Sequence, residues 1–309
     1  MIKEIAFAGW KHNLSIQGKT TELVITLDVG PRILRYGFPG ERNVFVEMAE
    51  QLGGSGEKEW MIRGGHRFWT APEADHSYEL DNAPVEWKKL GNSAVEITQP
   101  PSPYGFQKTL RVEMGADEAV CVTHSLKNLG AKPIEVTPWA LSVMAPGGTA
   151  YIPQPRLDLH PNEFPEGRET KPEDFLPNRE MVLWPFTNLT DGRYTFTEHF
   201  LQVTQQPGKP ATKLGLKLAT GWIAYQNGDC VFAKHLAYDP TQPYPDRGVN
   251  FEIFTNPAIL ELESLAPATP LAPGATRDHV EHWALRKTAN NLSHGKFAKE
   301  LFDTLPKIG

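Results

Sequence analysis

The stretch NFEIFTNPAILELES, residues 250–264, contains the pattern that decides the fold. Two runs of alternating apolar and polar residues flank Asn256 and Pro257, and this arrangement is typical of antiparallel strands joined by a short turn. The stretch GWIAYQNGDCVFAKHLAY, residues 221–238, has the same form around an Asn-Gly turn. Both stretches therefore predict β-hairpins.

Short segments of the same kind recur through the rest of the chain. They mostly alternate apolar with polar residues and are rich in Val, Ile and Thr, so they predict strands with one buried and one wet face. The 26 glycines and 27 prolines of the 309-residue chain separate these segments instead of gathering in a linker. We therefore predict an all-β protein, a large antiparallel β-sandwich that forms a single domain over residues 1–309. The further predicted strands are residues 21–30, 31–38, 94–100, 108–115, 119–128 and 134–144.

Few short helices and one long loop are expected beside these strands. One short helix is predicted near WKHNL, residues 10–14, and another at about residues 295–305, where apolar residues recur every four positions from Phe297 to Leu305. Residues 153–193 are rich in proline and charge, which predicts a long loop excursion. Long loops in compact domains usually cover or build a site.

Composition narrows the possible partners. The formal net charge of −6 offers no basic surface for nucleic acid, so a small molecule is the expected partner. Cys121 and Cys230 lie far apart without a partner motif, which predicts neither a disulfide scaffold nor a cysteine metal site. The N-terminal residues lack an apolar signal region, and no apolar run is long enough to span a membrane. We expect a cytoplasmic protein without membrane contact, and its oligomeric state is not predicted.

Three motifs, taken in order along the chain, resemble those of the galactose mutarotase-like superfamily. IRGGHRFWTAPE, residues 62–73, resembles a stretch of its hexose-6-phosphate mutarotase branch. VTPWALSVMAPGG, residues 136–148, lies where the superfamily has a His-x-Tyr-Phe strand. Residues 259–285 are similar to its closing section, in which a Glu-bearing strand precedes a Leu-x-Pro-Gly turn and a last strand. Together with residues 21–38, the resemblance spans nearly the whole chain and is closest to a bacterial branch of mutarotase-like proteins.

The resemblance implies a fold and a reaction. The fold is a β-supersandwich with a carbohydrate site in its concave face. The reaction is that of aldose 1-epimerases, in which a Glu removes the proton of the anomeric hydroxyl and a His protonates the ring oxygen. Residues 137–141 read TPWAL and hold no His where the family carries its acid. The acid is therefore relocated, or the chemistry is lost.

The hairpin at residues 250–264 gathers carboxylates. Period-two alternation places Glu261 and Glu263 on the same face of its second strand. A turn of two or four residues is expected to set Glu252 opposite Glu261, and a three-residue turn to set it against Leu262. Crowded carboxylates raise at least one pKa, and a Glu with a raised pKa suits a general base near neutral pH. Glu263 is the first candidate base and Glu261 the second, while the alternative is an acidic, solvated edge strand.

The motif at residues 62–73 combines glycines with arginines and rings. Gly64 and Gly65 allow a left-handed backbone or a close approach of a ligand. Arginine donors suit hydroxyl, carboxylate or phosphate groups, and an aromatic ring suits the C–H face of a sugar. The alternative is that the rings belong to the core and the arginines pair with Glu73 or Asp75. The candidate substrate contacts here are Arg63, His66, Arg67, Trp69 and His76, with Trp139 on a later strand.

The stretch KHLAYDPTQPYPDRG, residues 234–248, is the second dense polar region. It follows one strand and precedes the first carboxylate strand, so its side chains are expected to reach the same cleft. His235 titrates in the range that suits proton donation and is the first candidate for the relocated acid, with His66 second. A structural role is the alternative for both. The candidate substrate contacts are Lys234, Tyr244, Asp246 and, from the next strand, Glu252.

No metal or cofactor is predicted. In HVEHW, residues 279–283, a strand would turn His279 and Glu281 to one side and His282 to the other, which matches no known zinc spacing. Motifs for serine hydrolases, NTPases and dehydrogenases are missing. Three functions stay open: an aldose 1-epimerase-like enzyme, a non-catalytic carbohydrate-binding or sensing protein, and a carbohydrate-active hydrolase or lyase that uses paired carboxylates.

Overall fold

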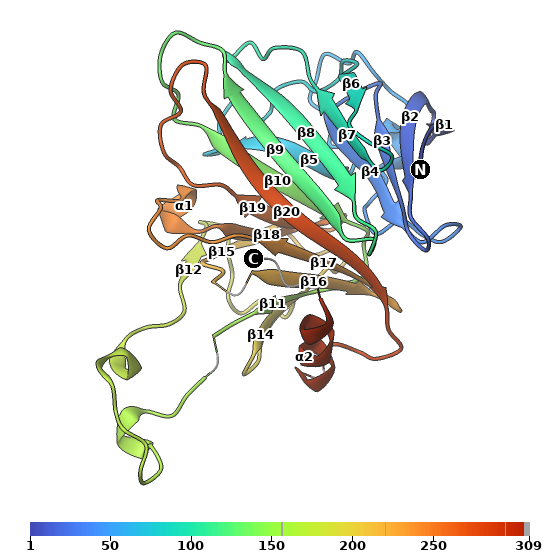
Figure 1. Cartoon of the computed structure of the whole chain (residues 1–309). Coiled ribbons are helices and arrows are strands. Elements are labelled where there is room, and N and C mark those ends of the chain that lie inside the picture. Colours follow the sequence, from blue (N-terminus) through green and yellow to red (C-terminus); the bar gives the residue numbers. More distant parts are fainter. Residues whose placement is uncertain (156, 220, 294, 306–309) are drawn as a thin grey trace.

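The structure of the chain is a computed structural model that describes residues 1–309 except 156, 220, 294 and 306–309. The side chains of residues 295, 297 and 298 also lie outside the described part. Two sheets of ten strands each dominate the molecule (Figure 1). We call them sheet 1 and sheet 2.

Each sheet pairs its strands antiparallel throughout. The order in sheet 1 is β1 (Ile2–Phe7), β2 (Trp10–Gln17), β3 (Glu22–Thr26), β4 (Arg32–Gly37), β5 (Gly65–Ala71), β10 (Thr137–Met144), β19 (Leu260–Leu265), β18 (Phe251–Thr255), β15 (Thr212–Leu216) and β12 (Met181–Leu183). The order in sheet 2 is β13 (Tyr194–Phe196), β14 (Phe200–Thr204), β11 (Thr149–Pro153), β16 (Trp222–Asn227), β17 (Cys230–Leu236), β20 (Thr276–Lys287), β9 (Val120–Asn128), β8 (Phe106–Met114), β7 (Ala94–Thr98) and β6 (Glu86–Lys89).

The two sheets pack face to face around a shared apolar core. Leu262 of sheet 1 and Phe232 and Trp283 of sheet 2 are among its fully buried members. The Phe45 ring lies 5.7 Å from the rings of both Phe232 and Trp283, so aromatic contacts tie the layers together. This architecture confirms the predicted all-β antiparallel sandwich.

Both predicted hairpins are present. Residues 221–238 contain β16 and β17, which close at the Asn227–Cys230 pair. Residues 250–264 contain β18 and β19, and their last pair joins Thr255 to Leu260. Because β19 lies between β18 and β10, the solvated edge strand considered for it is wrong.

The helix predicted near residues 10–14 is wrong, because this segment is the start of strand β2. The strand is buried continuously from Asn13 to Ile16, so period-two alternation does not mark it in the sequence. Pairing with β1 and β3 on both sides determines the structure instead. The turn before it is made by Ala8 and Gly9, both with positive φ.

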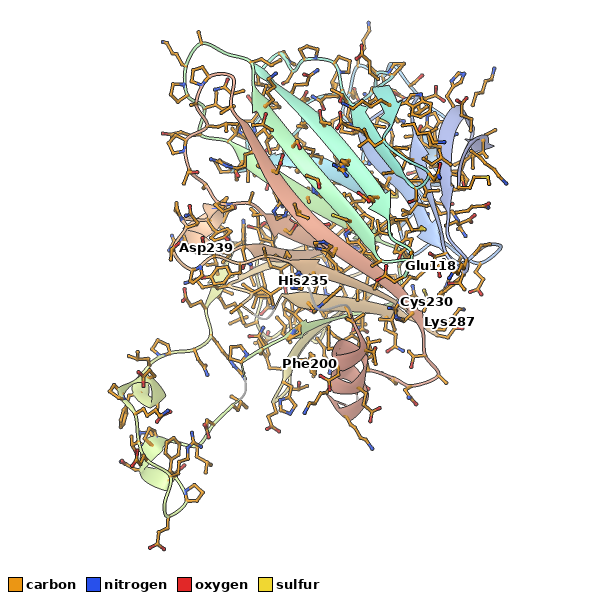
Figure 2. All side chains as sticks on the ribbon, viewed as in Figure 1. Glu118, Phe200, Cys230, His235, Asp239 and Lys287 are labelled. Carbon is orange, nitrogen blue, oxygen red and sulfur yellow. The ribbon has the colours of Figure 1, made fainter. Side chains whose placement is uncertain are left out.

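Little of the chain is helical. The short α1 (Pro245–Gly248) lies before β18, and α2 (Gly295–Thr304) lies near the C-terminus. Phe302 of α2 stacks on Phe200 of β14 at 5.8 Å between ring centres, and Phe200 is labelled in Figure 2. The side chain of Phe297, which helped to predict α2, is outside the described residues. Among the described residues, no helix is long and apolar enough to cross a membrane.

Residues 154–180 leave the sandwich as an arm between β11 and β12 (Figure 1). Apart from the 3₁₀ turns η2 (Pro161–Glu163) and η3 (Pro172–Phe175), the arm has no regular element among its described residues. A bidentate ion pair between Arg168 and Asp158 links its two sides.

Candidate functional site

A cavity of about 270 Å³ opens on the face of sheet 1 that points away from sheet 2. Its floor comes from alternate residues of β5, β10 and β19, since the residues between them face the core. Side chains from β15, β18 and the segment after β12 complete the wall. The polar lining residues are Arg67, Glu73, Lys213, Asn256, Glu261 and Glu263, and the aromatic ones are Trp60, Trp69, Tyr78, Trp139, Trp184, Phe186 and Phe254.

Two glycines allow β5 to reach this floor. Gly64 and Gly65 have φ of +91° and +75°. A Cβ on Gly64 would lie 2.0 Å from the carbonyl oxygen of Val46, and one on Gly65 would lie 2.4 Å from that of Ile33. The close approach that these glycines permit is thus made by the chain's own backbone.

The first polar unit of the cavity joins Glu261 to Arg67. Arg67 Nη2 donates to Oε1 of Glu261 at 2.8 Å, and both side chains are nearly buried. The guanidinium carbon lies 4.6 Å from the ring centre of Trp69 and 5.2 Å from that of Trp60. A charged hydrogen bond and two cation–π contacts therefore hold Arg67 in place.

The second unit repeats this arrangement around Lys213. Its Nζ lies 3.1 Å from Oε2 of Glu263 and 2.6 Å from Oε2 of Glu252. The same nitrogen lies 4.7 Å from the Trp139 ring centre and 4.9 Å from that of Trp184. One ammonium thus serves two carboxylates.

The register of the hairpin differs from the prediction. Glu252 pairs with Glu263, not with Glu261 or Leu262. Four residues, 256–259, separate the last paired residues Thr255 and Leu260, and a turn of that length sets Glu252 opposite Glu263. The predicted gathering of three carboxylates on one face holds, with Glu252 behind the cavity and fully buried.

The carboxylates outnumber the cations that they contact. Burial raises the pKa of Glu252 well above its ordinary value, Lys213 opposes this, and the nearby Glu263 adds to it. Burial likewise raises the pKa of Glu261. Arg67 lowers this pKa and Glu263 raises it further, but burial has the largest effect. Burial alone would lower the pKa of Lys213, but Glu263 and Glu252 reverse the effect and raise it. The site therefore keeps its ammonium charged and makes the carboxyl groups of Glu252 and Glu261 more basic.

Several buried donors of the cavity have no partner among the described residues. These are Nε and Nη1 of Arg67 and the indole nitrogens of Trp60 and Trp139. Neither oxygen of Glu252 receives a well-directed hydrogen bond, although Lys213 lies close. Buried polar groups in native proteins are usually paired, so unpaired ones beside a cavity leave room for a further partner such as water, an ion or a ligand.

Opposite the cavity, a second polar cluster lies between the two sheets, where the core face of β5, β10 and β19 meets β9, β17 and β20 of sheet 2. We call it the core network; its members are His66, His124, Ser142, Lys234, Ser264, His279 and Glu281. Lys234 Nζ lies 2.7 Å from Oε1 of Glu281 and donates to the Leu262 carbonyl at 2.9 Å. Ser264 and the Trp283 indole also donate to Glu281.

Hydrogen-bond partners determine the protons of the core network. His124 Nδ1 faces the carbonyl oxygen of His279 at 3.0 Å and must donate to it. His124 Nε2 then accepts from His66 Nε2 at 2.7 Å, and His66 Nδ1 accepts from Ser142 at 2.9 Å. Burial lowers the pKa of all three histidines, that of His279 to about 3, so they are neutral near pH 7.

The core network resembles a metal site only in composition. His66, His124 and Glu281 present ligand atoms within 4.8 Å of one another. Two of these atoms are already hydrogen-bonded to each other, and the Lys234 ammonium neutralises the third. Burial alone would raise the pKa of Glu281, but Lys234 and the histidines hold it well below its ordinary range. The geometry therefore favours an ion pair with a histidine pair.

The structure brings together five of the predicted site residues as lining groups. Glu261, Glu263, Arg67, Trp69 and Trp139 surround the cavity, with Glu252 directly behind. Sequence reasoning missed Lys213, which lies in the short alternating strand TKLGL without any charged neighbour to mark it. It also missed the aromatic wall of Trp60, Trp184, Phe186 and Phe254.

Other predicted site residues lie elsewhere. His66 and Lys234 belong to the core network. Arg63 is fully buried and bonds Glu57 at 2.5 Å and Asn82 at 2.8 Å, so neither predicted partner, Glu73 or Asp75, is used. His76 lies beside Thr70 at 2.8 Å. Tyr244 stacks on Tyr238, and Asp246 is in α1 with a left-handed φ.

His235 is not in the cavity. It lies on β17, on the face of sheet 2 that points away from sheet 1, and is labelled in Figure 2. Its ring centre is 5.1 Å from that of Trp222. Period-two alternation turns it opposite to Lys234, which faces the core. In the part of the chain that the structure describes, no histidine lines the cavity.

A larger hollow of about 900 Å³ lies where α2 meets β14 and β16. The charged groups that line it, such as His199, Lys296 and Lys299, are exposed to solvent. Convergent buried polar groups occur in the smaller cavity, which we therefore take as the candidate site.

Comparison with solved structures identifies the fold. A galactose mutarotase-like protein from Lactobacillus casei aligns with a TM-score of 0.53 and 12% identity over 89% of this chain and 100% of its own. A galactose mutarotase-like protein from Clostridium acetobutylicum aligns with a TM-score of 0.53 and 11% identity, over 93% of this chain and 99% of its own. A galactose mutarotase related enzyme from Lactobacillus acidophilus aligns with a TM-score of 0.52 and 10% identity, over 91% of this chain and 99% of its own. No family model and no curated protein matches the sequence.

Proposed function

We propose that this chain, which has the galactose mutarotase-like fold, binds a small sugar in the cavity of sheet 1 and catalyses aldose 1-epimerisation. The observation that carries the proposal is the pair Glu261 and Glu263 on the cavity floor, each held by a cation over aromatic rings. Unpaired donors on Arg67 and Trp139 suit hydroxyl oxygens, and the rings suit C–H faces.

Glu263 is proposed as the general base and Glu261 as the second candidate. A carboxylate held by Lys213 and facing an aromatic cavity is fixed in position, so it can accept the proton of the anomeric hydroxyl without rearrangement. The raised pKa of Glu261 suits that group to the same role. Since the family's His has no counterpart in the cavity, the acid step falls to another lining group or to water.

Exchange spectroscopy by NMR on the α and β anomeric signals of free hexoses tests the proposal. The protein is expected to accelerate exchange, and Glu263→Gln to reduce the rate by about a hundredfold or more, the usual contribution of a general base. Glu261→Gln is the matched variant, one pleat away on the same strand. If Glu261→Gln reduces the exchange rate more than Glu263→Gln does, Glu261 is the general base.

The missing histidine gives a second candidate function a specific basis. Saturation-transfer NMR detects sugar binding separately from anomer exchange. If sugars bind but anomer exchange stays at the uncatalysed rate, the cavity belongs to a binding or sensing protein. If a glycosidic bond is cleaved and Glu263→Gln stops the cleavage, the paired carboxylates serve a hydrolase or lyase. Either result would contradict the epimerase proposal.

A further inference from the structure

Carboxyl groups outnumber cations around the cavity. Glu252, Glu261 and Glu263 face two cations, Arg67 and Lys213. Glu73 adds a fourth carboxylate among the lining groups. No other Lys, Arg or His among the described residues lines this cavity.

Both cations are already engaged by the protein. Arg67 bonds Glu261, and Lys213 is divided between Glu252 and Glu263. A phosphate or carboxylate on a ligand would therefore meet carboxylates whose cations are taken, between aromatic walls that screen the repulsion weakly. The arrangement disfavours an anionic sugar.

A ligand cation would meet the opposite conditions. The two cations of the protein show how this cavity holds positive charge, because each lies against a carboxylate and over two indole rings. The Tyr78, Phe186 and Phe254 rings line the cavity without serving either cation. Carboxylate and ring faces are the partners that bind an ammonium group.

The unpaired donors add a second requirement. Nη1 of Arg67 and the indole nitrogen of Trp139 belong to side chains that are 3% and 2% exposed, and they need acceptor atoms. A simple amine offers none, whereas hydroxyl and ring oxygens do. The ligand must therefore combine oxygen acceptors with one positive charge.

We propose that the cavity takes an amino sugar, a pyranose that carries a free protonated amine. This proposal rests on the function proposed above and names its substrate class. The ammonium would bind among Glu261, Glu263 and the free ring faces, while the hydroxyl oxygens accept from Arg67 and Trp139. Such a ligand reduces the excess negative charge and satisfies the unpaired donors together.

The test compares four forms of one hexose by NMR titration at low salt and pH 6.5. The probes are glucosamine, glucose, N-acetylglucosamine and glucose 6-phosphate, with the galactose series in parallel. Glucosamine is expected to bind about tenfold more tightly than glucose, and glucose 6-phosphate the most weakly. Added salt should weaken the binding of glucosamine and leave that of glucose unchanged.

Two variants separate charge from shape. Glu261→Gln keeps the size of the side chain and removes one carboxylate, so the preference for glucosamine over glucose should shrink several-fold. Glu113→Gln changes the protein's net charge equally but lies on the far sheet in β8, paired with Arg111, and should leave the preference intact. Thermal unfolding of both variants confirms that they are folded.

The outcomes distinguish the two proposals. Equal affinity for glucose and glucosamine, with accelerated anomer exchange, overturns the amino-sugar inference and leaves the epimerase proposal standing. Tight binding of glucosamine without accelerated anomer exchange supports the amino-sugar inference and overturns the epimerase proposal. Tightest binding of glucose 6-phosphate contradicts the charge argument, and no binding in either series overturns both.

Discussion

The two faces of β5, β10 and β19 contrast in how their polar groups are satisfied. On the core face, no side-chain nitrogen or oxygen of the core network is buried without a hydrogen-bond partner among the described residues. On the cavity face, Arg67, Trp139 and Glu252 all carry unpaired atoms. Polar residues that satisfy one another are explained by the fold alone, whereas unpaired polar atoms beside a cavity are the ones that a ligand could satisfy.

The largest effect is expected from breaking the ion pair of the core network. Lys234→Met leaves Glu281 buried without its cation, and the free energy of unfolding should fall by about 3–5 kcal/mol. Denaturant unfolding measures this loss. The double variant Lys234→Met/Glu281→Leu should recover much of the stability, because no charge remains unpaired. A loss below about 1 kcal/mol in the single variant would mean that the pair is not structural.

Period-two alternation explains how much of this contrast could be predicted from the sequence. It places Glu261 with Glu263 on one face, and the structure has this arrangement. Alternation does not show which face of a strand packs into the core and which lines a cavity or meets solvent. Lys234 and His235 are adjacent in sequence, yet one enters the core network and the other lies on the outside of sheet 2.

The rest of the site depends on contacts between distant segments. Lys213 reaches Glu263 only because β15 and β18 pair in one register, and nothing in TKLGL marks that lysine. Glu252 was assigned the wrong partner because a two-residue turn and a four-residue turn were given the same register, whereas each two added turn residues move the partner of Glu252 two residues along β19, from Glu261 to Glu263. Tertiary pairing, not local propensity, also made a strand of residues 10–14.

Acid should destabilise the core network in a defined pH range. The folded state lowers the pKa of His279 from 6.5 to about 3, so its stabilising contribution is complete above pH 6.5 and is lost as the pH falls towards 3. The expected loss is about 1.4 kcal/mol per pH unit for this group, or about 2 kcal/mol by pH 5.

Denaturant unfolding of His279→Gln between pH 7 and 5 measures this contribution. The Gln amide can still donate to Ser264, as His279 does at 2.6 Å, but it does not titrate. The variant should therefore lose stability with acid less steeply than the parent. Parallel pH profiles would show that His279 is not held neutral.

Two tryptophans provide a matched pair across the faces. Trp283 donates to Glu281 at 2.8 Å, whereas the Trp139 indole nitrogen has no partner among the described residues. Both rings are buried, so replacement by Phe removes the same ring atoms and the same indole N–H at each position. Trp283→Phe should cost about 1.5 kcal/mol more than Trp139→Phe, the value of a hydrogen bond to a charged group. Equal losses would remove the distinction between satisfied and open donors.

The smallest effect has the opposite sign. The folded state raises the pKa of Glu252, so this group stabilises the protein below its ordinary pKa of 4.5 and loses that contribution as the pH rises. Near pH 8, Glu252→Gln should therefore raise the free energy of unfolding by about 1 kcal/mol, and the gain should vanish towards pH 4.5. The control is Glu79→Gln, since Glu79 has Lys108 at 3.0 Å and receives a hydrogen bond from Gln99, and this change should destabilise. A more stable but less active Glu252→Gln variant would show that the carboxylate is retained for the ligand and not for the fold, whereas a destabilised one would place Glu252 with the core network as a structural group.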